Sequence, residues 1–197
     1  MRDRCFAREI RFLALAAGLL IVPACSSDNS NGNVLNPPGV TTFLLQYDGP
    51  RDASPDLTGN RTYEAAARFT TTETAPVAGG KLTEVQFYIQ TVPDTCRVRI
   101  YGAGTATTPG AILYSADVTP IGASWNTHVL TSDVTVTAND LWISIEFRDT
   151  LTQPTIGCDP GPAAPNGRWL YDSSSGSWAP FVVDVNWNVR GVVEVAI

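Results

Sequence analysis

Lysine, histidine and long apolar runs are all scarce in this sequence, and each scarcity argues against a class of function. Lys81 is the only lysine and the formal net charge is −6, whereas proteins that bind nucleic acid gather lysine and arginine against the phosphates. His128 is the only histidine, which argues against a zinc site. No apolar run approaches the ~20 residues that a transmembrane helix needs. We therefore expect neither a nucleic-acid partner nor a membrane-spanning helix.

The first 25 residues have the order of an export signal. Four arginines precede an unbroken apolar run over residues 12–22, and Val22-Pro23-Ala24-Cys25 follows. This order resembles a bacterial lipoprotein signal with its lipobox. The resemblance implies cleavage before Cys25 and acylation of that residue, and attachment by more than one acyl chain gives stable anchoring. The alternative is an ordinary cleaved signal peptide in which Cys25 has no role.

The sequence predicts three parts. They are a signal peptide with its apolar helix over residues 1–24, a lipidated Cys25 and flexible tether over 25–40, and one folded domain over 41–197. Four of the 13 basic and two of the 19 acidic residues precede Cys25, which leaves an acidic mature chain with 9 against 17. No aspartate directly follows Cys25, a pattern that resembles an outer-membrane lipoprotein of enteric bacteria. We expect a lipid-anchored protein of the cell envelope, in the outer membrane or at the cell surface.

The predicted domain contains two cysteines, Cys96 and Cys158. Exported proteins form disulfides, and an even pair is most simply interpreted as one bridge. We therefore predict a disulfide between Cys96 and Cys158. The alternative is two free buried thiols.

Period-two alternation of apolar and polar side chains dominates the chain after Thr41. Val85, Phe87 and Ile89 alternate with polar residues, and residues 96–101 and 141–147 follow the same pattern. The pattern is typical of antiparallel strands with one buried face, and turn residues separate the runs. Further strands are expected over 42–48, 63–71, 111–118, 125–131, 133–137, 168–172, 178–183 and 187–196. Because no stretch after the signal shows convincing helical periodicity, we predict an all-β sandwich or barrel.

Several runs of the sequence are similar to a family of jelly-roll-like accessory domains. These runs are GGKLTEVQFYI, VRIYGAG, PGAILYSADV, WNTHVLTSDVTVTANDLWISIEF, GPAAPNGRWLYD and NWNVRGVVE, and they cover nearly all of residues 43–195. Domains of this family occur in secreted bacterial proteins, beside extracellular peptidases and in adhesin-like chains. The resemblance implies an antiparallel, jelly-roll-like β-sandwich with a role in binding, adhesion or spacing.

An aromatic and polar sheet face is the first candidate binding site. If residues 85–89 and 141–147 bury their apolar side chains, the opposite side chains share an exposed face and the next strand adds more. A pyranose ring stacks on aromatic rings, and its hydroxyl groups pair with planar polar groups. We therefore expect glycan binding at Trp142, Tyr88, Gln86, Arg97, Arg99, Tyr101 and Glu146, with Glu84 beside them. The alternative is that Trp142 and Tyr88 are covered by a loop or pack across strands.

Two arrangements would support hydrolysis instead. Glu84, Glu146 and Glu194 would supply the paired carboxylates of a glycoside hydrolase, although ion pairs with arginines on neighbouring strands explain them more simply. His128 would serve a serine nucleophile, but no Gly-x-Ser-x-Gly sequence is present and a lone strand histidine is more often structural.

The connection between Arg148 and Gly167 is long, rich in proline and irregular. Such segments in a compact domain are uncommon and often functional. With Trp169, Tyr171 and Trp178 just beyond it, the connection would form the rim of a ligand site. The alternative is a rigid crossover pinned by its prolines and by the predicted disulfide.

The first loop of the domain is a candidate for structural calcium, and no other cofactor is expected. It contains Asp48, Asp52 and Asp56, and calcium takes several oxygen ligands from carboxylates and carbonyls. No EF-hand or RTX spacing is present. The alternative is that these aspartates are turn residues.

Two tryptophans, Trp125 and Trp187, each precede an asparagine. Two dipeptides do not make a repeat, and we expect each tryptophan to begin a core strand. Trp187, Val189 and Val193 fit one buried face of the last strand.

The function that these patterns favour is a lipid-anchored, noncatalytic binding or adhesion module outside the cytoplasm. Its partner would be a glycan, a peptide or another envelope protein. The alternatives are a hydrolase on the sheet face and a structural surface lipoprotein without a small ligand. The exposure of Trp142 and Tyr88 distinguishes these functions, because a lattice of arginine and glutamate over that face would favour the structural one.

Overall fold

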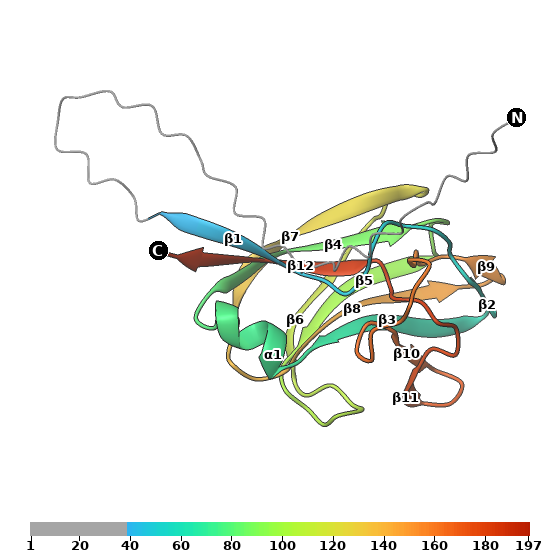
Figure 1. Ribbon diagram of the computed structural model, residues 1–197. Helices are drawn as coiled ribbons and strands as arrows, with labels where there is room; N and C mark the ends of the chain where they lie inside the picture. The colour runs from blue at the N-terminus through green and yellow to red at the C-terminus, as the bar shows by residue number, and fades with distance from the viewer. Residues whose placement is uncertain (1–38) are drawn as a thin grey trace, which may run out of the picture. The chain divides into compact units, whose positions relative to one another are not determined.

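The computed structural model describes residues 39–197, which form two β-sheets packed face to face (Figure 1). The strands are β1 (Val40–Leu45), β2 (Asp56–Leu57), β3 (Arg61–Phe69), β4 (Lys81–Ile89), β5 (Thr95–Tyr101), β6 (Ile112–Asp117), β7 (Ser124–Thr135), β8 (Leu141–Asp149), β9 (Gln153–Pro154), β10 (Trp169–Asp172), β11 (Ser177–Pro180) and β12 (Val189–Ala196). The four-stranded sheet has the order β1-β12-β4-β7 and the six-stranded sheet the order β11-β10-β3-β8-β5-β6, with a small β2-β9 pair. Every strand pairing is antiparallel. The predicted all-β antiparallel sandwich is confirmed.

The core lies between the two sheets and is built from the alternating side chains of the predicted strands. Val85, Phe87 and Ile89 of β4 are buried, as are Ile143 and Ile145 of β8. Burial of each such side chain stabilises the fold by about 1.5–3 kcal/mol. The remaining side chains of β4 and β8 consequently point away from the core, to the outer face of their own sheet.

One predicted pair of strands is a single strand. Residues 125–131 and 133–137 both fall largely within β7, whose pairing with β4 shifts register between Leu82 and Glu84. A bulge of this kind inserts a residue without ending the strand, so the period-two pattern is interrupted while the hydrogen bonding continues.

A short helical segment follows β3, although no helical stretch is predicted there. It consists of α1 (Thr71–Thr74) and the 3-10 turn η1 (Ala75–Val77). Thr70 caps it: the Thr70 hydroxyl accepts a hydrogen bond from the Thr72 amide, and the Glu73 carboxylate accepts one from the Thr70 amide at 2.8 Å. This capping box acts on one turn of chain, too short for helical periodicity to register.

The long connection after β8 is a packed crossover. It contains β9, and isolated bridges tie Ile156 to Ile89 and Cys158 to both Ala53 and Trp187. Asp159 fastens its far end, because its carboxylate accepts hydrogen bonds from the amides of Gly49, Gly161 and Asn186 and from the Asn186 side chain, at 2.7–3.0 Å. These contacts support the rigid-crossover interpretation of this segment.

The predicted disulfide is absent: Cys96 and Cys158 are free, buried thiols. Cys96 lies on β5 in the six-stranded sheet. Cys158 lies in the crossover, where its backbone bridges to Ala53 and Trp187 and its thiol approaches the Ala53 carbonyl oxygen at 3.5 Å. Different elements hold the two cysteines, so their thiols do not meet. An even number of cysteines in the sequence gives no information about their positions in space.

The predicted signal peptide, Cys25 and most of the predicted tether lie outside the described residues. Within residues 39–197 we find no helix of the length and hydropathy that a membrane span requires.

Candidate functional site

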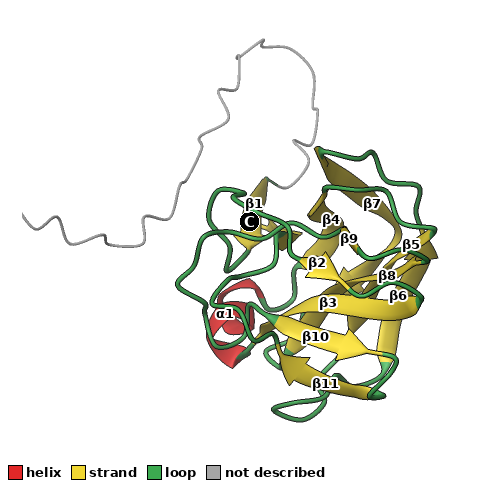
Figure 2. Cartoon of the chain, turned by 90° about the vertical axis from the view of Figure 1, so that its right-hand side faces the viewer, coloured by secondary structure: helices red, strands yellow, loops and turns green. Residues whose placement is uncertain are grey.

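The predicted glycan-binding residues are divided between the outer faces of two different sheets. Tyr88 and Gln86 point outward from β4 in the four-stranded sheet, whereas Trp142 and Glu146 point outward from β8 in the six-stranded sheet. Figure 2 shows β4 and β8 in separate layers. The seven predicted residues therefore do not share one face, because alternation separates inward from outward side chains but does not say which sheet a strand joins.

Glu146 and the arginines of β5 form a lattice of ion pairs on the six-stranded sheet. The Arg99 guanidinium lies 2.7 Å from the Glu146 carboxylate, and Arg97 lies 3.6 Å from Glu146 and 2.7 Å from Asp117. The cross-strand charge pairing that we weighed against a hydrolytic site is thus present. This lattice occupies the polar part of the face, which is the outcome that favours a structural role for this face over glycan binding.

A buried carboxylate lies beside that lattice. Glu64 of β3 accepts hydrogen bonds from the hydroxyl groups of Ser144 (2.5 Å) and Tyr101 (2.7 Å), and Arg99 lies 3.4 Å away. Burial raises the pKa of Glu64 above its usual range, and the nearby Glu146 carboxylate acts in the same direction while the hydrogen bonds and Arg99 oppose it. Glu64 therefore joins β3, β5 and β8, and it has no open surface for a substrate.

Trp142 is not a platform for a sugar because other aromatic rings cover it. It has no exposed surface, and its ring lies 5.3 Å from Trp169 and 5.7 Å from Trp178, centroid to centroid. The Arg68 guanidinium lies 5.9 Å from its ring centroid. Tyr171 packs on Trp178 in turn. The aromatic residues after the long connection thus pack over Trp142 instead of forming the rim of a ligand site.

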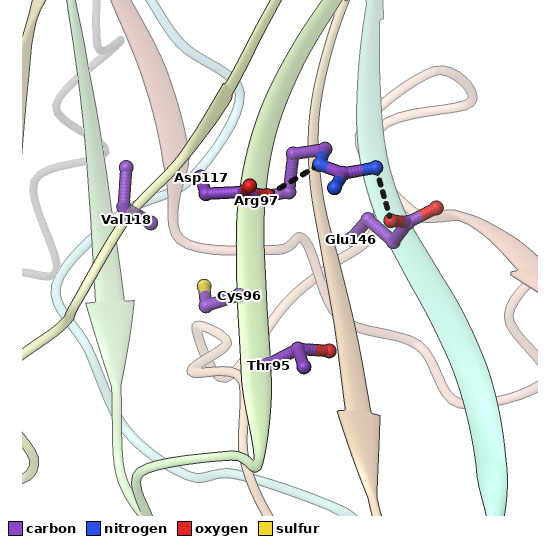
Figure 3. A pocket seen from close by; sticks show the side chains of 6 residues that line it. All are labelled: Thr95, Cys96, Arg97, Asp117, Val118 and Glu146. Carbon is purple, nitrogen blue, oxygen red and sulfur yellow. Dashed lines mark hydrogen bonds and ion pairs between the residues drawn. The ribbon is translucent and has the colours of Figure 1, made fainter.

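A shallow cavity of about 290 Å³ lies beside the start of β5 and the end of β6 (Figure 3). Its lining consists of Thr95, Cys96, Arg97, Asp117, Val118 and Glu146. Arg97 spans it by pairing with both carboxylates. Burial raises the pKa of the Cys96 thiol to about 12, and that of Cys158 to about 11. A nucleophilic cysteine needs a lowered pKa, so this cavity offers no activated thiol.

The residues considered for hydrolysis are also separated. Glu84 lies on the outer face of the four-stranded sheet and Glu146 on that of the six-stranded sheet, so they cannot flank one glycosidic bond. His128 of β7 pairs with the Tyr114 hydroxyl at 2.8 Å, and burial lowers the pKa of its imidazole. In the described residues His128 therefore links the edges of the two sheets.

The predicted calcium site does not assemble. Asp48 is buried and its carboxylate is already paired with Arg190 and Asn188, while Asp52 and Asp56 are exposed. Across residues 39–197, no three histidine, cysteine, aspartate or glutamate side chains converge to hold a metal ion. Asp48 is a partner of Arg190 instead of a metal ligand.

The outer face of the four-stranded sheet carries a second aromatic group, which we call the aromatic–arginine site. It consists of Arg51, Gln86, Tyr88, Trp125 and Arg190. Trp125 and Tyr88 are cross-strand partners whose rings meet edge to face at 5.9 Å, and Trp125 is 37% exposed. The Arg190 guanidinium lies 4.1 Å from the Trp125 ring centroid, and that of Arg51 lies 4.9 Å from the centroid of Tyr88.

Buried polar contacts hold this site in place. The Asp48 carboxylate accepts hydrogen bonds from Arg190 Nε at 3.0 Å and Nη2 at 2.8 Å, and from Asn188 Nδ2 at 2.7 Å. Such a bidentate pair fixes the plane of the guanidinium that stacks on Trp125. Gln86, the cross-strand neighbour of Arg190, is half-buried and has no side-chain hydrogen bond among the described residues. The site therefore presents fixed rings and an available amide on one surface.

Three members of this site, Trp125, Arg51 and Arg190, are not among the binding residues predicted from the sequence. Trp187 is buried as predicted, but Trp125, expected in the core, is exposed. The alternation along β7 could have shown that Trp125 is exposed. Trp125, Thr127 and Val129 alternate with Asn126 and His128, and the odd-numbered positions are the exposed ones. Arg51 reaches the site from a loop. Arg190 reaches it from β12, and it lies beside Gln86 because β12 pairs with β4.

The chain resembles part of a clostridial protease. It aligns with the structure of the clostridial cysteine protease Cwp84 after propeptide cleavage with a TM-score of 0.55 and 13% identity. The alignment covers 80% of this chain and 40% of that chain. At this identity the likeness shows a shared fold and carries no activity across.

Two viral structures are further matches. Infectious bursal disease virus strains Gx and Gt align with TM-scores of 0.26 and 0.24 and identities of 11% and 12%. They cover 81% and 88% of this chain and 30% and 46% of their own chains. No protein-family profile matches the sequence, and no curated protein matches it.

Proposed function

We propose that this protein is a noncatalytic, lipid-anchored module of the cell envelope that binds glycans at the aromatic–arginine site. The observation that carries the proposal is the exposed Trp125 beside Tyr88, with Gln86 available on the same face. By contrast, the tryptophans Trp142 and Trp169 of the other sheet are buried.

The chemistry of this face suits a sugar ring. The C–H face of a pyranose packs on an indole, and amide and guanidinium groups are planar donors and acceptors for its hydroxyls. Because Asp48 and Gln90 already hold the two arginines, little side-chain entropy is lost when a ligand binds.

The position of the site agrees with an anchored binding module. Val40, where the chain enters the four-stranded sheet, pairs with Ala196 at the same end as Lys81, while Tyr88 lies near the other end of β4. A ligand at Tyr88 is therefore bound at the end of the sheet away from the chain entry. Anchoring through Cys25 in the outer membrane or at the cell surface, with no nucleic-acid partner, completes the proposal.

The test is a glycan array with the full chain in detergent, repeated with Trp125→Ala. Loss of a stacked ring is worth about 1–2 kcal/mol, so we expect affinity to fall about five- to thirtyfold. Val129→Ala is the matched control, because Val129 is 62% exposed on the same strand. Binding that survives Trp125→Ala undiminished, or the absence of any glycan ligand, would overturn the proposal.

A further inference from the structure

One arginine of the aromatic–arginine site, Arg51, forms no ion pair within residues 39–197, although the exposed Asp52 follows it in the chain. Arg190 is neutralised by the buried Asp48, 2.8 Å away. Arg51 has no ion-pair partner among the described residues: its Nη2 donates to the neutral Gln90 side chain at 2.6 Å, and its Nε is buried without a partner. In an acidic protein, this places an unpaired guanidinium directly on the face of Tyr88.

The charge is confined to one end of the site. Glu84, on the same face of β4, lies four residues before Tyr88, or about 13 Å along the strand. Beyond a Debye length of about 10 Å, water and salt screen most of the interaction between exposed charges, so Glu84 has little effect at the Tyr88 end of the site. A ligand spanning Gln86 to Arg51 would therefore meet neutral polar groups at one end and a cation at the other.

From this asymmetry we infer that the ligand is an acidic oligosaccharide, with the ring of a uronic acid stacked on the exposed Trp125 and its carboxylate paired with Arg51, which lies over Tyr88. This inference rests on the proposed function and names its ligand class. A guanidinium pairs with a carboxylate through charge-assisted hydrogen bonds, which are stronger than the bonds it makes to a hydroxyl. The stacked rings favour a glycan over an acidic peptide, which has no pyranose face to offer them.

The experiment compares galacturonate, glucuronate and mannuronate oligosaccharides with their methyl esters, by calorimetry on the full chain in detergent. Esterification keeps the ring and removes the charge. We expect at least one acid to bind about tenfold more tightly than its ester, with the difference reduced at high salt. Arg51→Gln should abolish the preference, so that acid and ester bind with equal affinity.

Arg148→Gln is the matched control, because Arg148 is an exposed arginine on the other sheet that also has no ion pair among the described residues. Trp125→Ala should weaken acid and ester alike. Equal binding of acids and esters, both lost in Trp125→Ala, would overturn the charge inference and leave the glycan site standing. If neither acids nor esters bind while neutral glycans do, the charge inference is also overturned and the glycan site still stands. Displacement of bound glycan by poly-glutamate at lower concentration than any uronate would show that the site takes an acidic peptide instead.

Discussion

Asp48 shows how the role of a single residue depends on partners that are distant in sequence. In the sequence it stands at a loop with Asp52 and Asp56, which suggests calcium. In the structure its carboxylate is buried under Arg190 and Asn188, two residues of the last strand region. The neutralising charge comes from arginine, so the carboxylate needs no metal ion.

Asp48→Asn should destabilise the protein by about 2–4 kcal/mol, because it leaves the Arg190 guanidinium without its countercharge. Urea unfolding measures the change. Asp52→Asn, an exposed neighbour, should change stability by less than about 0.5 kcal/mol. EDTA should leave the unfolding midpoint of the natural protein unchanged; a midpoint that falls with EDTA and recovers with calcium would restore the metal interpretation.

At the scale of elements, alternation predicts the strands and their inward faces, but not their partners. The β3, β8 and β5 strands are neighbours in the six-stranded sheet, and their register places Glu64 opposite Glu146, and Glu146 opposite Arg97. Like charges directly opposite destabilise a sheet. Arg99 relieves this repulsion by pairing with both carboxylates.

The raised pKa of Glu64 predicts a pH dependence of stability. The folded state binds the proton of the Glu64 carboxyl group more tightly than the unfolded state does. The contribution of Glu64 to folding stability is therefore largest below about pH 4.5, the ordinary pKa of this group, and it declines as the pH rises through the raised pKa of the folded state. The slope is at most about 1.4 kcal/mol per pH unit. In urea titrations across this range, Glu64→Gln should lack the decline, whereas Glu194→Gln, an exposed control, should keep it. Identical pH profiles for Glu64→Gln and the natural protein would contradict this account.

At the scale of the whole molecule, the two ends of the four-stranded sheet have different roles in our proposal. The chain enters at Val40 beside the carboxyl end of β12, and the aromatic–arginine site lies toward the opposite end of β4. The site therefore lies away from the point where the chain enters the sheet. These roles depend on the predicted lipidation of Cys25.

Cys25→Ala should abolish anchoring, because Cys25 supplies the thiol that takes the lipid in a lipoprotein signal. Mass spectrometry of the natural mature chain should find acyl groups on Cys25, and fractionation should find the chain with membranes. Cys5→Ala, within the predicted signal, is the control and should leave both unchanged. A natural mature chain with an unmodified thiol at Cys25 would contradict the prediction.

The sequence by itself determined the all-β class, most strand positions and which side chains face inward, because period-two alternation is a local property of an extended chain. The start of the chain also resembles an export signal, and this stays a prediction because those residues lie outside the described part of the chain. Only the tertiary structure decided that Tyr88 joins Trp125 and not Trp142, that Asp48 meets Arg190, and that Cys96 and Cys158 stay apart. Those outcomes depend on which strands become neighbours, and contacts between residues far apart in the sequence, 142 positions for Asp48 and Arg190, leave no local pattern to read.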